Sequence, residues 1–299
     1  MNNKLDKLTK NDAQAITRRQ AFKTLGLGLA GMTATRFGLN QAHAITNGQL
    51  DGNGHPNVGG VVWLVSPWAN AQPPVVCGSG TLIHPRVYLT AGHGTYLIQN
   101  LITQGQITLN ELFVSFSSNA SDPTTWLPVS GVVTHPGFVP NASSSEDVGA
   151  LILKQSLSAI PTIPLPPAGF LEALAASGQL KANETKFTAV GYGVDPGDAN
   201  NGHLPFPPDG LRRFAQLEFQ NLHDRWLCLD QNDSHGNGGT CTCDSGGPLF
   251  YADPVGGQQT LVSIVSWGTL TAEHSYRVDT SVALDFISDV IRRVNNGEL

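Results

Sequence analysis

The residues best suited to chemistry lie in one short stretch, 240–249, which reads Thr-Cys-Thr-Cys-Asp-Ser-Gly-Gly-Pro-Leu. Ser245 lies there between Asp244 and two glycines, a composition that favours neither helix nor strand but lets the backbone turn sharply or approach another segment closely. A serine hydroxyl is a weak nucleophile at neutral pH and needs a neighbouring base. Alone, the stretch would indicate only a polar turn, so its chemistry depends on what the rest of the chain supplies.

A histidine and an aspartate adjoin strand-like segments upstream of this stretch. Residues 87–94 read Val-Tyr-Leu-Thr-Ala-Gly-His-Gly and contain His93, and residues 147–153 read Asp-Val-Gly-Ala-Leu-Ile-Leu and begin with Asp147. A carboxylate that opens an apolar strand is costly to bury unless it is hydrogen-bonded. Together with the Ser245 stretch, the two motifs resemble those of the chymotrypsin-like (trypsin-family) serine peptidases, and the resemblance covers nearly all of residues 45–295.

The resemblance implies nucleophilic acyl transfer, with Ser245 as nucleophile, His93 as general base and Asp147 as the group that orients the imidazole. Glu146 is the competing carboxylate, but Asp147 fits the motif better. The backbone N–H groups of Cys243 and Ser245 would form the oxyanion hole. The family has glycine where this chain has Cys243, and this departure puts the geometry of that hole in question.

The fold class that the resemblance implies is all-β, with two packed six-stranded antiparallel β-barrels and a C-terminal α-helix. The many glycines and prolines between short apolar runs agree with short strands joined by turns. We expect an N-terminal barrel over residues 45–165 and a C-terminal barrel over 166–299. A terminal helix packed on the second barrel is predicted from apolar residues at helical spacing: Val282, Phe286, Ile287, Val290, Ile291 and Val294.

The first 44 residues read as an export signal. Arg18 and Arg19 precede a mildly apolar, glycine-rich segment at 25–32, and residues 42–44 read Ala-His-Ala, a small-x-small cleavage pattern. The paired arginines are typical of twin-arginine export, while an ordinary secretory signal and an amphipathic leader helix are the alternatives. We therefore expect a secreted or periplasmic protein with no membrane anchor after signal removal.

Ile45 follows the expected cleavage site directly and resembles the new N-terminal residue of the activated family members. The resemblance implies that its freed amine pairs with Asp244, because a buried ammonium needs a buried carboxylate. Signal removal would then also be the activation step. Cleavage elsewhere, for instance after Ala34 with a short pro-segment to Ala44, is the alternative.

The four cysteines, Cys77, Cys228, Cys241 and Cys243, allow three pairings. In the family, the segments that hold Cys77 and Cys243 face each other across the leaving-group side of the site. On that resemblance we expect the disulfides Cys77–Cys243 and Cys228–Cys241. Buried thiols are the alternative, since cysteine often serves as a small apolar residue.

The resemblance also assigns the specificity pocket. Gly239 stands at its floor, so no aspartate is present there to balance a bound cation, and cleavage after arginine or lysine is not expected. His274 either points into the pocket and favours an acidic residue or lies in a solvent-exposed loop. The assigned residues are Gly239, Thr240, Ser266, Trp267, Gly268 and His274.

Composition narrows the function further. Only 13% of the residues are charged, the net charge is -6, and no basic cluster occurs in the body of the chain, so a nucleic-acid partner is not expected. No cofactor or metal motif is found. We expect a monomeric serine endopeptidase that acts on proteins or peptides. The alternatives are a catalytically silent homologue that acts as a binding protein, suggested by Cys243, and an esterase with the same acyl chemistry.

Overall fold

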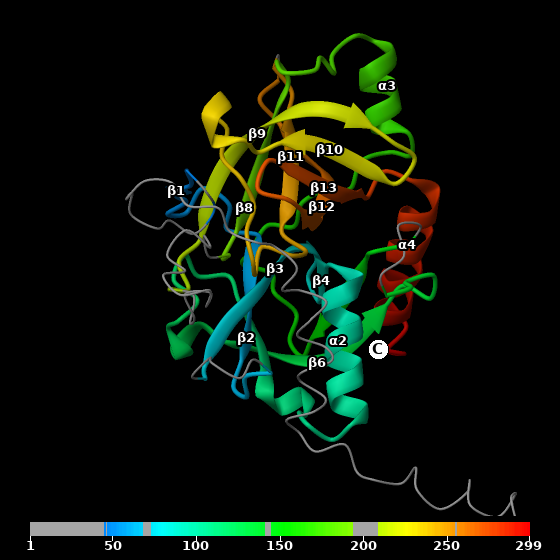
Figure 1. Ribbon diagram of the computed structural model, residues 1–299. Coiled ribbons are helices and arrows are strands. Elements are labelled where there is room, and N and C mark those ends of the chain that lie inside the picture. The colour runs from blue at the N-terminus through cyan, green and yellow to red at the C-terminus, as the bar shows by residue number, and fades with distance from the viewer. Residues whose placement is uncertain (1–44, 46, 68–72, 141–144, 194–208, 255) are drawn as a thin grey trace, which may run out of the picture.

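The computed structural model contains two closed antiparallel β-barrels of six strands each, stacked one on the other (Figure 1). The described residues are 45, 47–67, 73–140, 145–193, 209–254 and 256–299. The predicted signal peptide, residues 1–44, lies outside them. The all-β fold class and the two barrels expected from the sequence are confirmed.

The first barrel is the lower one in Figure 1 and carries His93 and Asp147. Its strands close in the order β2-β3-β4-β7-β6-β5. The strands are β2 (Val58–Trp63), β3 (Val75–His84), β4 (Val87–Thr90), β5 (Leu112–Ser115), β6 (Leu127–Thr134) and β7 (Gly149–Leu153).

The second barrel carries Ser245 in the loop before β11. It closes in the order β8-β9-β10-β13-β12-β11, and β1 (Gln49–Leu50) pairs with Arg213 and Phe214 at the start of β9. The strands are β8 (Lys186–Gly191), β9 (Arg213–Leu222), β10 (Trp226–Asp230), β11 (Pro248–Ala252), β12 (Gln259–Gly268) and β13 (Ala272–Arg277). The predicted boundary at residue 165 falls in the connection between β7 and the second barrel.

Helices occupy little of the described chain. They are α2 (Gly92–Thr103), α3 (Phe170–Ala176) and α4 (Ser281–Asn295), with 3-10 turns at Leu109–Glu111, Pro123–Thr125 and Asp233–His235. The sequence analysis did not predict α2, although its buried residues Thr95, Ile98 and Leu101 recur at helical spacing.

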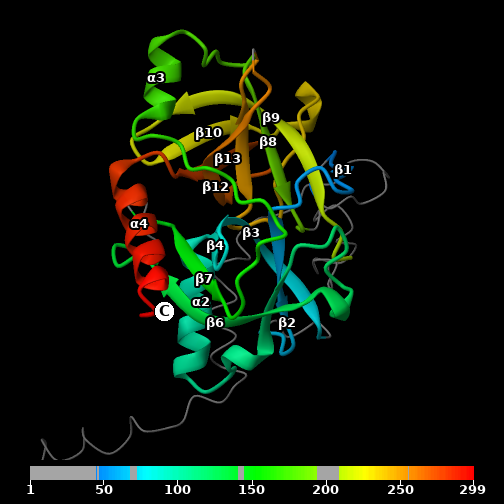
Figure 2. The same cartoon turned by 180° about the vertical axis from the view of Figure 1, so that it is seen from behind.

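The terminal helix α4 forms where it was predicted, but it packs largely on the first barrel. Figure 2 shows it leaving the second barrel and running down beside β7 and β4. The ring of Phe286 lies 5.0 Å from that of His135, and Asn295 bonds His84 at 3.1 Å, both partners belonging to the first barrel. Of the predicted apolar face, Val282 is exposed. The helical period identifies an apolar face, but it does not tell which surface that face meets.

A buried ion pair ties the two barrels together. The guanidinium of Arg212, one residue before β9, donates from Nε to Asp51 Oδ2 at 2.7 Å. Its Nη1 donates to the carbonyls of Val58 (2.9 Å) and Phe116 (2.8 Å), at the ends of two first-barrel strands. Burial by itself would raise the pKa of Asp51, but hydrogen bonds from His55 and Arg212 lower it to about 2. The pair is thus a buried ion pair with further hydrogen bonds to the first barrel.

Replacing Arg212 with methionine is expected to destabilise the protein by about 3–5 kcal/mol, because Asp51 would keep a buried charge without its partner. Urea unfolding of the exported protein measures this change. The matched control is Arg292→Met, which removes an exposed ion pair on α4 and should change the free energy of unfolding far less. Equal effects of the two substitutions would contradict a role for Arg212 in joining the barrels.

Candidate active site

His93 and Asp147 are brought together by neighbouring strands. Thr90 ends β4 and pairs with Gly149, which begins β7, so the residues just beyond these two positions share one end of the first barrel. His93 Nδ1 lies 2.9 Å from Asp147 Oδ2, and the backbone N–H of His93 donates to Oδ1 at 2.7 Å. The hydroxyl of Ser266, on β12 of the second barrel, also donates to Oδ2.

Asp147 also caps helix α2. The residue at the N-cap is Ala91, whose side chain cannot accept a hydrogen bond. The first N–H groups of a helix lack intrahelical partners, and a nearby anion satisfies them and interacts favourably with the helix dipole. Asp147 supplies this anion from another strand when it accepts the N–H of His93. The same carboxylate therefore fixes the helix start and the imidazole ring.

Asp147 and His93 each shift the pKa of the other in the direction that favours its charged form. Burial opposes the charge of Asp147, but the charge of His93 and the hydrogen bonds from His93 and Ser266 outweigh burial and lower the pKa of Asp147. Burial also opposes the charged form of His93, yet the carboxylates of Asp147 and Glu273 raise its pKa above 6.5. The arrangement favours an imidazolium beside an ionised aspartate.

Glu146, the competing carboxylate, points away from His93. Its Oε1 accepts a hydrogen bond from Arg225 Nε at 2.8 Å, and its Oε2 accepts one from the Tyr276 hydroxyl. The adjacent acidic residues thus have separate partners. Asp147, and not Glu146, is the carboxylate that holds the imidazole.

The loop of Ser245 lies against the start of the His93 helix. Gly246 has a φ of +81°, and a Cβ atom there would lie 2.1 Å from Thr90 Oγ1 and 2.5 Å from the backbone nitrogen of Ala91. Only glycine fits such a contact. The carbonyl of Ser245 accepts the N–H of Ser79 at 2.9 Å. The structure therefore places the loops of all three motifs at one junction between the barrels.

Cys243 takes the backbone conformation that glycine would take. Its φ is +76°, in the left-handed region that side chains disfavour. A disulfide joins it to Cys77 on β3, with Cα atoms 4.5 Å apart. Its carbonyl accepts hydrogen bonds from the N–H of Gly78 and the hydroxyl of Ser79, both at 3.1 Å. The expected Cys77–Cys243 pair is thus confirmed, and it lies beside the Ser245 loop.

The expected pair Cys228–Cys241 is wrong, because both residues are thiols in the structure. The β10–β13 register sets Cys228 opposite His274, whose Nδ1 lies 3.1 Å from its Sγ. Burial raises the pKa of Cys228 to about 11. Cys241 belongs to the nucleophile segment, where its N–H donates to Asp244. The family resemblance did not predict that the pairing of β10 with β13 sets Cys228 opposite His274.

Asp244 is a buried carboxylate held by backbone donors alone. Its oxygens accept the N–H groups of Gly193 and Cys241, each at 2.8 Å, and burial raises its pKa to about 7. No lysine, arginine or histidine of the described residues forms an ion pair with it. Ile45 is fully buried, with a φ of +58°.

Three of the six expected pocket residues, Thr240, Ser266 and Gly268, lie around a carboxylate that was not predicted from the sequence. Glu273 Oε2 accepts the hydroxyl of Thr240 at 2.6 Å, and its Oε1 accepts the N–H of Ser266 at 3.3 Å. In the β12–β13 register Glu273 lies opposite Gly268. Burial raises the pKa of Glu273 to about 7. A charged residue near the start of a short strand was the available signal.

Gly239 lies beside Gln231, where a Cβ atom would come within 3.0 Å of the Gln231 side chain. Trp267 and His274 form a separate stack, with ring centroids 3.9 Å apart and planes at 11°. His274 follows Glu273 directly in β13, and successive side chains of a strand point to opposite faces. His274 therefore contacts Trp267 and Cys228 on the side of β13 away from Glu273.

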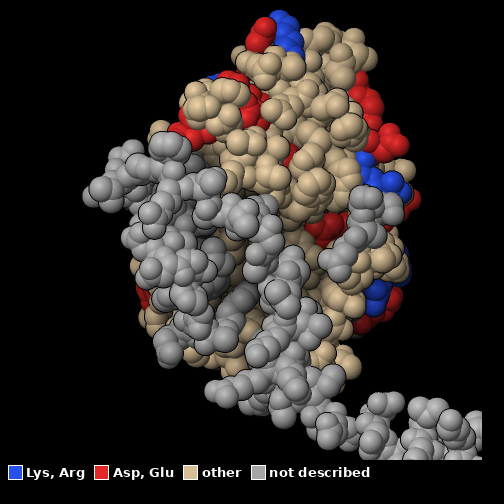
Figure 3. All heavy atoms as spheres, in the orientation of Figure 1, with Lys and Arg blue, Asp and Glu red and all other residues tan. Residues whose placement is uncertain are grey.

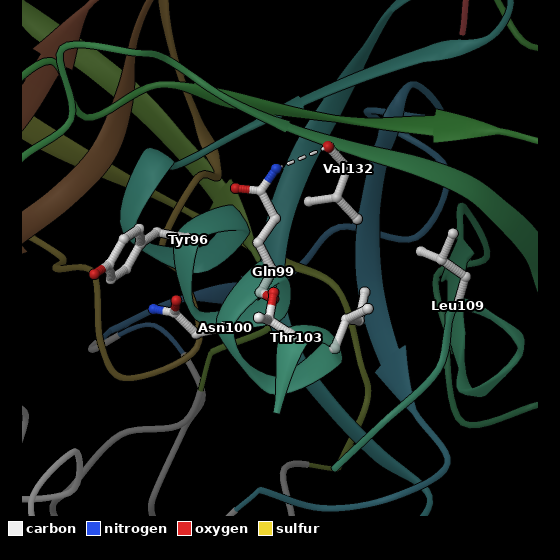
Figure 4. Close-up of a pocket in the computed structure, with 7 residues that line it drawn as sticks. Tyr96, Gln99, Asn100, Thr103, Leu109 and Val132 are labelled. Atoms are coloured by element: carbon white, nitrogen blue, oxygen red, sulfur yellow. Dashed lines mark hydrogen bonds between the residues drawn. The ribbon is translucent and has the colours of Figure 1, made fainter. Parts of the chain in front are cut away.

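A surface hollow lies elsewhere on the first barrel, between α2, β6 and the turn Leu109–Glu111 (Figure 4). Gln99 Nε2 donates there to the Val132 carbonyl at 3.0 Å and so holds α2 on β6. None of His93, Asp147 and Ser245 lines it. Its lining residues are Tyr96, Gln99, Asn100, Ile102, Thr103, Leu109 and Val132.

Among the described residues no group of three or more histidines, cysteines and acidic residues is placed to hold a metal ion. Within the same ranges no helix is long and apolar enough to cross a membrane. On the face drawn in Figure 3 the charged side chains that are described lie scattered among uncharged ones.

Loss of the disulfide should expose the strain at Cys243. Cys77→Ala is expected to destabilise the protein by about 2–5 kcal/mol, since the bridge joins residues 166 apart in the sequence. The double variant Cys77→Ala/Cys243→Gly should recover about 1–2 kcal/mol, because glycine adopts the left-handed conformation without a steric penalty. Unfolding of both variants under reducing conditions tests this. A double variant no more stable than Cys77→Ala would contradict it.

Comparison with known proteins agrees with this geometry. The family model described as Trypsin matches residues 52–288, which is well over half of the chain. No curated protein matches the chain. Two closed six-stranded barrels are the fold that the chymotrypsin-like resemblance implied. The chain therefore belongs to the trypsin family.

Proposed function

We propose that this chain is a secreted serine endopeptidase, which hydrolyses peptide bonds through an acyl-enzyme on Ser245. Membership of the trypsin family supports a serine protease-like function. The observation that carries the proposal is the 2.9 Å contact between His93 Nδ1 and Asp147 Oδ2, at the junction where the Ser245 loop packs. Trypsin-family domains are typically extracellular, and we further propose export by the twin-arginine route.

The contacts assign a role to each group. Because Asp147 holds the Nδ1 side of the ring, Nε2 is left to take the proton of Ser245 as its oxygen attacks the substrate carbonyl. His93 then returns that proton to the leaving amine. Water then attacks the acyl-enzyme, and His93 takes the proton of the water and returns it to Ser245 as the product leaves. Asp147 stays ionised throughout and stabilises the imidazolium.

The negative oxygen of the tetrahedral intermediate would accept hydrogen bonds from the backbone N–H groups of Cys243 and Ser245. One such donor contributes on the order of 3–4 kcal/mol to the transition state. The backbone around Cys243 is held by its disulfide to Cys77 and by the hydrogen bonds that its carbonyl accepts. These contacts fix the loop before substrate arrives. The cysteine that departs from the family's glycine is therefore compatible with a formed oxyanion hole.

Export is proposed to activate the enzyme. Among the described residues Asp244 accepts hydrogen bonds only from neutral backbone donors, and burial raises its pKa to about 7. An amine freed at Ile45 would supply the missing positive charge, and a paired ammonium lowers the pKa of a buried carboxylate. The resulting ion pair would stabilise the loop that presents the oxyanion donors. Without signal removal the loop lacks this interaction.

A fluorophosphonate probe tests the nucleophile and its activation. The exported protein is expected to begin at Ile45 and to gain one adduct by intact mass, and to react faster than the full-length precursor. Ser245→Ala should gain none, while the control Ser158→Ala, which changes an exposed serine, should gain one. A correctly processed protein without an adduct would favour the binding-protein alternative. Comparing amide with ester substrates separates peptidase from esterase.

The protonation of His93 gives a second test. In the Ser245→Ala protein, NMR titration of His93 should show a midpoint above 6.5, since Asp147 and Glu273 stabilise the charged ring. Asp147→Asn should move the midpoint to lower pH. In the active enzyme, kcat/KM should fall as the pH drops through the His93 pKa. Asp147→Asn should lower kcat by about the 10⁴-fold that loss of the equivalent carboxylate costs such a protease. An unmoved midpoint would contradict the pairing.

A further inference from the structure

Cys243 occupies a position in a tight turn that favours glycine. The N–H of Asp244 donates to the carbonyl of Cys241 at 3.1 Å and closes a turn over residues 241–244. Of the two central residues only Cys243 has a positive φ, which is +76°. A positive φ at the third residue is characteristic of a type II turn, where glycine or asparagine is usual. A cysteine at this position therefore needs another interaction to hold its backbone.

The alternative conformation of this turn would remove a donor from the oxyanion hole. Type I and type II turns differ mainly by a rotation of about 180° of the peptide between their two central residues. Here that peptide joins Thr242 to Cys243, and its N–H is the N–H of Cys243. If Cys243 relaxed to the negative φ that side chains prefer, this N–H would point to the opposite face of the turn. The conformation of one residue thus decides whether the donor is presented.

The disulfide connects this turn to the core of the first barrel. Cys77 lies in β3, and its carbonyl accepts the indole N–H of Trp63 at 2.7 Å. The bridge from Cys77 brings its Cα atom within 4.5 Å of that of Cys243. The carbonyl of Cys243 accepts hydrogen bonds from Gly78 and Ser79 of the same strand. The turn is therefore fixed to β3 by one covalent bond and by these hydrogen bonds.

We propose that Cys77 is a positioning residue for the oxyanion hole: its disulfide holds Cys243 in the conformation that glycine favours, so that full activity requires oxidation of the two thiols. The inference rests on the proposed peptidase function and adds a second maturation step to it. Cleavage before Ile45 would supply an ammonium group to Asp244, and oxidation would fix the peptide that donates to the oxyanion. The two steps act on neighbouring residues of one loop.

The bridge forms by exchange with a disulfide oxidant, which is a small disulfide or that of another protein. The thiolate of one cysteine attacks the oxidant, releases one of its sulfurs as a thiol and forms a mixed disulfide. The thiolate of the other cysteine then closes the Cys77–Cys243 bond and releases the second sulfur. The oxidant gains two electrons and the two protons that the cysteines lose. The finished bridge is shielded from thiols in solution, because Cys77 is 8% and Cys243 4% exposed.

Two double variants that differ only by a methyl group test the positioning role. Cys77→Ala/Cys243→Ala and Cys77→Ala/Cys243→Gly both lack the bridge, and both are prepared to begin at Ile45. On a peptide amide, kcat should be about tenfold lower for the alanine variant, because the steric penalty of the left-handed conformation depopulates the productive turn by about that factor. KM should be equal, since the N–H acts on the transition state. The oxidised wild-type protein should match the glycine variant.

The wild-type protein provides a second measurement that needs no variant. Unfolded in urea with excess dithiol, then refolded and assayed in the dithiol, it should lose about tenfold in kcat per folded molecule. Oxidised glutathione added during refolding should restore kcat, and circular dichroism gives the folded fraction. The Cys77→Ala/Cys243→Gly protein should have the same kcat with and without the dithiol. Because Cys228 and Cys241 are thiols in the structure and are retained in both proteins, their effects cancel from the comparison.

The outcomes separate the two proposals. Equal kcat values for the two double variants, or for reduced and oxidised wild-type protein, would overturn the role of Cys77 and leave the peptidase intact. If the oxidised wild-type protein cuts no peptide and Ser245 takes no probe, the peptidase proposal fails. Crystal structures of the two double variants then test the turn without turnover. A negative φ at residue 243 in the alanine variant and a positive one in the glycine variant support the positioning role, and the same sign in both rejects it.

Discussion

The arrangement of this site depends on the carboxylate of Asp147. It accepts hydrogen bonds from the first-turn N–H of α2 and the imidazole of His93 in the first barrel, and from the hydroxyl of Ser266 in the second. One side chain thereby begins a helix, orients a ring and joins two domains. A buried carboxylate is tolerated only where its oxygens are satisfied. The cost of burying Asp147 thus enforces the geometry that acyl transfer needs.

The other two buried acids near Ser245 differ from Asp147 in their hydrogen-bond partners. Asp244 and Glu273 are buried with neutral donors, and both have pKa values raised to about 7. In the proposed activation Asp244 receives its positive charge from the amine of the chain itself. The charge around the Ser245 loop is therefore incomplete until the protein is processed.

The features that could be predicted from the sequence are those that lie within short contiguous motifs. His93, Asp147 and Ser245 lie in motifs whose local spacing fixes a strand end or a tight turn, and the structure places those motifs at one junction. The sequence could not show Glu273, because its position depends on the β12–β13 register and on the absent side chain of Gly268. The Cys228–Cys241 pairing failed for a similar reason: strand register sets Cys228 opposite His274. Local patterns specify elements, whereas contacts between elements decide partners.

The position of α4 has a consequence for the order in which the protein is made. The core beneath this helix combines Val58, Leu89 and Ile152 of the first barrel with Phe286 and Val290 of the helix. The first barrel is synthesised early, yet the residues that cover this part of its core follow the strands of the second barrel in the chain. Its apolar surface consequently stays open during synthesis of the second barrel, and an incomplete chain exposes a surface prone to aggregation. The first barrel is therefore covered only after the second barrel has been made.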